Sequence, residues 1–207
     1  FVGLDLSEVH IRQGQEIAQL AGLHNVTLHH ADLTKFEVEP GSFDFVIAHG
    51  LYSWVPPFAR DGLLALIGRA LTPNGIAVVS YNTLPGQGLF EPMRALMRFH
   101  TAPLSDPNAK VRQARSIASA WCEHFIATDN QGRGAIAKRL STVVEALSPM
   151  MVRHDYLSEF EHPIWFTDFV AHAEKHGLAY LDNALPSAQR AELLESAARE
   201  MLMQLDD

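Results

Sequence analysis

Short apolar runs alternate with amphipathic segments along the first half of the chain. Residues 1–7 are typical of a strand that ends at Asp5, and Ser7 after it is a typical helix N-cap. The predicted helix runs to Gly22, a residue suited to the left-handed conformation that ends many helices. A second short strand is predicted over residues 26–30. The first unit is therefore strand, helix, strand.

Two further apolar strands follow, with a helix between them. Residues 43–48 are nearly all apolar, which is typical of a strand buried on both faces, and His49 and Gly50 come directly after it. An amphipathic helix is expected next, ended by a turn at residues 72–75, and then an apolar strand over residues 76–81. Repeated strand and helix units predict a doubly wound parallel α/β sheet.

The pattern changes to helices after residue 86. Apolar positions recur at helical spacing over residues 114–125 and 136–147. Another helix is expected over residues 167–176, ended by Gly177, with a late strand over residues 178–181.

Prolines mark the predicted domain boundary. Pro103 and Pro107 separate the two kinds of pattern. We therefore predict an α/β domain over residues 1–103 and a mainly helical domain over residues 104–207.

Composition narrows the classes of partner and compartment. The 207 residues are 47% hydrophobic, which indicates a folded globular protein, and a net charge of −8 disfavours a nucleic-acid partner. The lone Cys122 forms no internal disulfide and, with scattered histidines, predicts no metal site. No apolar run approaches the roughly 20 residues that span a bilayer, and no signal peptide is evident, so we expect a cytoplasmic protein without a membrane partner.

Polar residues follow three of the predicted strands, at the sheet edge where open α/β folds bind ligands. Asp5 is placed to accept hydrogen bonds from ribose hydroxyls. Asp32 is placed to accept from an adenine amino group while Leu33 packs on the ring. His49 and Gly50 follow the third strand. The alternative for both carboxylates is a local turn or helix cap.

These segments resemble a known family. VGLDLS, NVTLHHADL, FDFVIAHGLYSWV and LTPNGIAVVSYNT look like strands two to five of a class I S-adenosylmethionine-dependent methyltransferase. HDYLSEFEHPIWFTDFVAHAEKHGLAYL resembles the helical methyltransferase regulatory region of bacterial proteins similar to protein-lysine methyltransferases. The resemblance implies that residues 1–103 form a partial methyltransferase domain and that residues 104–207 regulate it or recognise its substrate.

The resemblance also implies S-adenosylmethionine as the cofactor and assigns its contacts. Asp5 would hold the ribose with Leu6 beside the adenine, and Asp32 with Leu33 would bind the adenine. The methionyl part would meet His49 and Gly50.

Strand one of the family, with its G-x-G loop, has no counterpart in the sequence, which predicts an N-terminally truncated chain. In the family fold strand one lies between the strands that end at Asp5 and His49. We therefore expect two rows of unpaired backbone groups there. Either the gap closes or another segment fills it, and we expect the isolated chain to be marginally stable.

Methyl transfer relies mainly on positioning, because the cofactor supplies the reactivity. An amine acceptor must lose a proton first, and His49, Tyr52, Tyr81 and Asn82 are the candidate catalytic residues at the strand ends. The alternative for His49 is a neutral histidine that backbone groups satisfy. The alternative for Tyr52 is aromatic packing over the sheet edge.

The leading hypothesis is therefore a methyltransferase with a methyl acceptor that the sequence does not identify, protein lysine being one candidate. The first alternative is a non-catalytic regulatory or binding protein of the same fold. The second is an NAD-dependent oxidoreductase, because an acid after a strand also suits NAD. The sequence predicts no oligomeric state.

Overall fold

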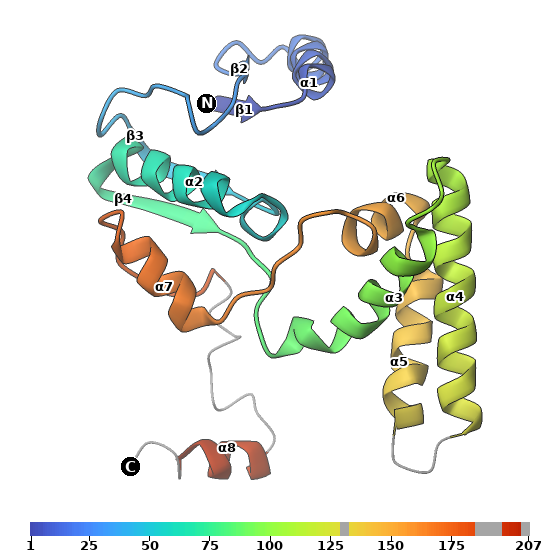
Figure 1. Cartoon of the computed structure of the whole chain (residues 1–207). Coiled ribbons are helices and arrows are strands. Elements are labelled where there is room, and N and C mark those ends of the chain that lie inside the picture. Colours follow the sequence, from blue (N-terminus) through green and yellow to red (C-terminus); the bar gives the residue numbers. More distant parts are fainter. Residues whose placement is uncertain (129–132, 185–195, 204–207) are drawn as a thin grey trace.

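The first strand-helix-strand unit forms as the apolar pattern indicates. A computed structural model describes residues 1–128, 133–184 and 196–203 (Figure 1). Strand β1 (Val2–Asp5) pairs in parallel with β2 (Thr27–His30), and helix α1 (Glu8–Leu20) joins them. The Ser7 hydroxyl caps α1 by accepting from the His10 backbone N–H at 3.4 Å, and Gly22 has φ +67°. The predicted cap and helix end are both confirmed.

The second unit repeats this order with longer strands. Strand β3 (Phe43–Ala48) leads through the short helix η1 (Tyr52–Trp54) to α2 (Pro57–Ala70) and then to β4 (Leu71–Val79). The two strands are parallel, and their register shifts between Phe43 and Phe45 because residues 72–75 stand as an insertion in the ladder. The predicted turn therefore lies within the bounds of β4.

The two units form separate two-stranded sheets, β1–β2 and β3–β4, in the described part of the chain (Figure 1). Parallel pairing and helical crossovers confirm the α/β class. The expectation that β3 is buried on both faces is wrong. Phe45 and Ile47 are 70% and 73% exposed, because α2 packs on the opposite face, where Ala48 is buried.

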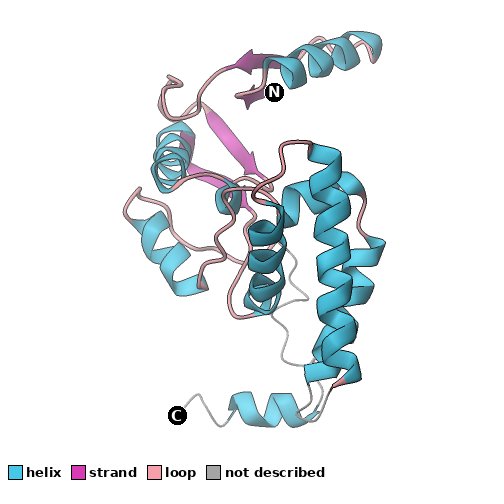
Figure 2. Ribbon diagram, turned by 45° about the vertical axis from the view of Figure 1, so that its right-hand side comes forward, coloured by secondary structure: helices cyan, strands magenta, loops and turns pink. Residues whose placement is uncertain are grey.

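Helices make up the following part of the molecule (Figure 2). A short helix η2 (Gly86–Phe90) leads into α3 (Glu91–Thr101), and Asp106 caps α4 (Pro107–Ala127). Helix α5 (Arg133–Ala146) packs along α4. The single turn α6 (Pro149–Met151) and the π-helical turn η3 (Val152–Tyr156) complete the group. Its shared core includes Met93, Met97, Ala114, Ala118, Cys122, Leu140 and Val152.

Helix α7 (Phe166–Glu174) returns to the second sheet, where Ala173 joins the core that contains Leu64 and Ile67. The strand predicted over residues 178–181 is wrong, because this segment has no ladder partner among the described residues. Leu178 packs into the core instead, and the Tyr180 ring meets Phe166 edge to face. Helix α8 (Ser196–Met203) follows.

No helix in the described ranges is long and apolar enough to cross a membrane. The domain limits predicted at residues 103 and 104 stay a prediction.

Candidate functional site

Hydrogen bonds pin the loops that follow β3 and β4 to one another. The Gly50 backbone N–H donates to the Ser80 hydroxyl at 2.7 Å, and the Ser80 N–H donates to the Ala48 carbonyl. One step further along, the Asn82 N–H donates to the buried Ser53 hydroxyl at 2.8 Å. The carboxyl ends of the two parallel strands therefore present one ordered edge, the usual place for a ligand in an open α/β sheet.

Aromatic rings pack beneath this edge. The Tyr81 ring stacks on Phe169 of α7 at 4.1 Å between centroids, and Tyr52 meets Phe169 edge to face at 5.1 Å. Burial, with smaller effects from two neighbouring tyrosines, raises the pKa of Tyr81 to about 12. Its hydroxyl is therefore a neutral hydrogen-bond donor at pH 7 rather than a base. Tyr52 is only 1% exposed, and its hydroxyl lies 2.7 Å from His172 Nδ1.

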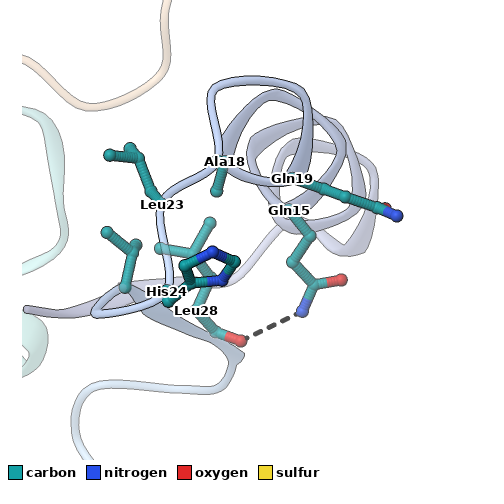
Figure 3. A pocket seen from close by; sticks show the side chains of 8 residues that line it. Gln15, Ala18, Gln19, Leu23, His24 and Leu28 are labelled. Carbon is teal, nitrogen blue, oxygen red and sulfur yellow. Dashed lines mark hydrogen bonds between the residues drawn. The ribbon is translucent and has the colours of Figure 1, made fainter.

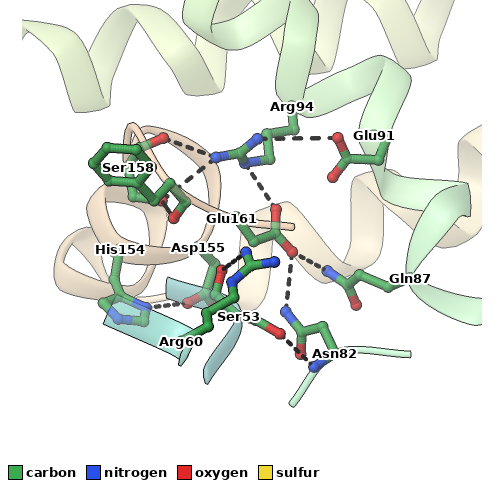
Figure 4. A network of polar contacts seen from close by, with 11 residues as sticks. Ser53, Arg60, Asn82, Gln87, Glu91, Arg94, His154, Asp155, Ser158 and Glu161 are labelled. Atoms are coloured by element: carbon green, nitrogen blue, oxygen red, sulfur yellow. Dashed lines mark hydrogen bonds and ion pairs between the residues drawn. The ribbon is translucent and has the colours of Figure 1, made fainter. Parts of the chain in front are cut away.

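A buried carboxylate connects this edge to the helical part (Figure 4). Glu161 is 2% exposed, and its Oε1 accepts from Asn82 Nδ2 at 3.0 Å and from Gln87 Nε2 at 2.9 Å. Its Oε2 lies 2.8 Å from Arg94 Nε, an ion pair whose atoms are not aligned as a hydrogen bond. Arg94 in turn donates to the Ser158 carbonyl. Glu161 therefore links three parts of the chain: the segment that follows β4, the short helix η2 and helix α3.

A cavity of about 340 Å³ opens beside this network. Trp54, Asn82 and Asp155 are among the residues that line it, and the His154 ring lies 4.2 Å from the Trp54 ring. Asp155 Oδ1 lies 2.8 Å from His154 Nδ1. An aromatic wall with a carboxylate and an amide suits a long side chain that carries a polar or cationic tip.

Both predicted cofactor carboxylates hold local turns. Asp5 Oδ1 accepts from the Ser7 N–H at 2.7 Å. Asp32 Oδ1 accepts from the N–H and the hydroxyl of Thr34, and these hydrogen bonds lower the pKa of Asp32. The observed contacts of Asp5 and Asp32 are therefore those of the alternative interpretation, in which each carboxylate stabilises a local turn. A carboxylate has about four lone-pair sites, so ribose or adenine contacts are compatible with these bonds and stay predictions.

The remaining predicted residues fall in three places. His49, exposed, and Gly50, with φ +64°, share the β3–β4 edge with Tyr52, Tyr81 and Asn82. Leu6, 72% exposed, lies with Asp5 at the end of β1, in the other sheet. Leu33 follows β2 but packs against the core of the second unit. All of these roles stay predictions.

A second cavity, about 230 Å³, lies between α1 and β2 (Figure 3). Gln15 crosses it to donate to the Leu28 carbonyl at 3.2 Å. None of the predicted site residues lines it.

Sequence reasoning missed Ser53, Arg94 and Glu161. Arg94 lies on the amphipathic helix α3, yet it is only 5% exposed. The available signal was weak: an acid between aromatic and apolar neighbours in FEHPIW, which carries no partner information.

Comparison with known families identifies two parts of the chain. Residues 1–75 match a methyltransferase domain, and residues 148–207 match a predicted methyltransferase regulatory domain. The resemblance found in the sequence is thereby confirmed in both halves.

Relatives and solved structures agree with these matches. An uncharacterised protein of Rickettsia prowazekii is 32% identical over 181 residues, which are 87% of this chain and 32% of that protein. A second R. prowazekii protein is 28% identical over 84% of this chain and 69% of its own length. PKMT2 from Rickettsia typhi in complex with AdoHcy superposes with a TM-score of 0.84 at 29% identity. That match covers the whole of this chain and 39% of PKMT2, so the chain spans about two fifths of the length of that protein.

Proposed function

We infer that this chain is part of an S-adenosylmethionine-dependent methyltransferase that carries a methyltransferase regulatory domain. The observation that carries the proposal is the superposition of the whole of this chain on 39% of PKMT2, supported by the two family matches on the same chain. AdoHcy, present in the PKMT2 complex, is what S-adenosylmethionine becomes after its methyl group has left.

The cofactor would lie across the ends of the strands. Asp5 would accept from the ribose hydroxyls with Leu6 beside the base, and Asp32 with Leu33 would bind the adenine. The methionyl part would reach His49 and Gly50. S-adenosylmethionine would supply the electrophilic methyl group. The protein's part would be to hold the acceptor in line with it and to exclude water.

We propose a protein lysine as the acceptor, in the cavity beside Trp54 and Asn82. Its aromatic wall suits the apolar stem of a lysine, and Asp155 suits the ammonium group before it loses its proton. Tyr81 does not line this cavity. As a neutral phenol at the β3–β4 edge, it would donate a hydrogen bond there rather than take a proton.

Cofactor binding tests the first part of this proposal. In the full-length protein, Asp5→Asn keeps an oxygen that can accept from the Ser7 N–H but removes the charge. We expect S-adenosylmethionine affinity to fall about 10- to 100-fold, the loss of about 1.5–3 kcal/mol for a hydrogen bond to a charged group. Calorimetry should show this with an unchanged melting temperature. The exposed Glu16→Gln on α1 is the control, and equal affinities for all three proteins would contradict the ribose role.

Methyl transfer tests the second part. Incubation of the full-length protein with deuterated S-adenosylmethionine and lysine-containing proteins should give labelled methyl-lysine by mass spectrometry. Trp54→Ala should lower this transfer at least tenfold, whereas Phe99→Ala, at an 82% exposed aromatic on α3, should not. Tight cofactor binding without transfer to any protein would favour the non-catalytic alternative.

A further inference from the structure

Two histidines and an aspartate from separate elements meet beside the second sheet. Asp61 lies on α2, His172 lies in the last turn of α7, and His176 follows four residues later. Asp61 Oδ1 is 2.9 Å from His176 Nε2 and 3.2 Å from His172 Nε2. One ligand atom from each residue lies within 4.8 Å of the others.

The two separations from Asp61 are close to what a tetrahedral metal ion requires, and the two histidine nitrogens, within 4.8 Å of one another, would draw together on binding. Zinc binds histidine nitrogen and carboxylate oxygen at about 2.0–2.2 Å, so two ligand atoms in a tetrahedral site stand roughly 3.3–3.5 Å apart. The observed separations from Asp61 need to widen by only a few tenths of an ångström. The side chains of His172 and His176 are 21% and 16% exposed and that of Asp61 is 63% exposed, which leaves an entry path and an open coordination position.

The backbone turn after α7 positions His176, the third ligand. Gly177 has φ +73°, and the His176 N–H donates to the Ala173 carbonyl, so the chain turns tightly after α7. The centroids of the His172 and His176 rings lie 5.5 Å apart. A spacing of four residues puts both rings on one side of the helix axis.

A second contact orients His172 for metal binding. Its Nδ1 lies 2.7 Å from the hydroxyl of the buried Tyr52, so the ring is held from behind while Nε2 points at Asp61. Histidines that bind metals in proteins are usually held in this way by a partner on the other ring nitrogen. In the metal-bound form Nδ1 would carry the hydrogen and donate to the Tyr52 oxygen.

We propose that Asp61, His172 and His176 bind a divalent transition metal of the Zn²⁺ class, which clamps α7 to α2. Two imidazoles with one carboxylate suit Zn²⁺, whereas Mg²⁺ and Ca²⁺ prefer sites made of oxygen ligands. No metal site is expected from the composition, although the HAEKH segment carries the spacing that pairs two histidines on a helix.

The clamp connects the two matched parts of the chain. Asp61 falls within residues 1–75, matched to the methyltransferase domain, and both histidines fall within residues 148–207, matched to the regulatory domain. Tyr52 extends the connection into the loop that carries Trp54 on the wall of the cavity. The inference goes beyond the proposed function and does not depend on it.

Metal binding to the full-length protein, stripped with chelator and freed of any affinity tag, tests the proposal. Calorimetry should show one equivalent of Zn²⁺ with a dissociation constant of about 1 μM or below, a melting temperature that rises with Zn²⁺, and no response to Mg²⁺. Co²⁺ should give the visible absorption of a tetrahedral complex. Failure to bind one equivalent of Zn²⁺, or an equal affinity for Mg²⁺, would overturn the site.

Matched variants distinguish this site from surface histidines. His176→Gln keeps a side chain that can donate to Asp61 and so protects the fold, but it should weaken Zn²⁺ affinity at least tenfold. Tyr52→Phe, which removes only the orienting hydroxyl, should weaken affinity by about 10- to 100-fold with the stoichiometry retained. His124→Ala, on α4, is the control and should bind as the parent does. Unchanged affinity in His176→Gln would reject the assignment.

Discussion

Glu161 is a single acid whose three contacts, with Asn82, Gln87 and Arg94, join parts of the chain that are far apart in sequence. Its side chain is fully buried, and its carboxylate neutralises Arg94, which is also almost fully buried. Breaking a buried ion pair by removing one partner leaves the other charge without compensation, and that loss exceeds the net value of the pair.

We therefore predict that Glu161→Gln destabilises the protein by about 3 kcal/mol, near the lower end of the range for a broken buried pair. The lower end applies because Glu91 lies 3.9 Å from Arg94 and still offers partial compensation. Urea denaturation measures the change. Glu159→Gln, an exposed acid on the same segment, should shift stability by less than about 0.5 kcal/mol. Equal stabilities of the two variants would show that the ion pair does not contribute to the free energy of unfolding.

Glu91 gives the same network a pH dependence. Partial burial, and then the charge of Glu161, raise the pKa of the Glu91 carboxyl. A carboxyl whose pKa is raised by folding favours the folded state when protonated, so its contribution is present below the unfolded pKa and is lost as pH rises through the folded value. Glu91→Gln stays neutral throughout. We predict that its stability relative to the parent rises as pH increases from about 4.3. Denaturation midpoints at several pH values test this, with Glu123→Gln as control, and the opposite slope would contradict it.

Helix α2 packs closely against α7 and the turn after it, because Gly68 on α2 has no side chain. A Cβ at Gly68 on α2 would stand 2.3 Å from the His176 carbonyl oxygen, a backbone atom that cannot move alone. Alanine normally stabilises a helix by up to about 1 kcal/mol relative to glycine.

At Gly68 we predict the reverse, a loss of about 1–3 kcal/mol for Gly68→Ala, because α7 must move away from α2. The same variant should weaken Zn²⁺ binding, since His176 moves with the carbonyl. Thermal unfolding and calorimetry measure both effects. Gly86→Ala is the matched control, because nothing lies within 4 Å of a Cβ there. A gain in stability at Gly68 would show that the two helices separate freely.

The sequence predicts an element well when the residues that determine it are neighbours in the chain. The Ser7 cap, the Gly22 helix end and the bounds of β3 depend on neighbouring residues, and the pattern identified them. Residues 178–181 carry a strand-like pattern, but a strand also requires a partner, which the described chain does not offer. Local pattern also does not reveal the meeting of Glu161 with Arg94, or of Asp61 with His176, because those pairs are formed by packing of distant elements.

At the scale of the whole molecule, the described part of the chain forms two separate parallel pairs, β1–β2 and β3–β4. The β3–β4 sheet also has an exposed apolar face. Phe45 lies opposite Ile76, and Ile47 lies opposite Val78, and all four side chains are on the same face. Their exposed fractions range from 39% to 73%. An apolar patch of this kind promotes association when nothing covers it.

We predict that the 207-residue chain by itself binds hydrophobic dyes and self-associates with rising concentration. Ile47→Lys should reduce both effects, because it places a charge within the patch. Its own stability should change by less than about 0.5 kcal/mol, since the side chain is mostly exposed. Light scattering after size-exclusion chromatography, with dye fluorescence, provides the measurement. Gln13→Lys adds the same charge to the exposed side of α1 and should leave association unchanged. If both variants reduced association equally, net charge rather than the apolar face would control it, because the position of the charge would then have no effect.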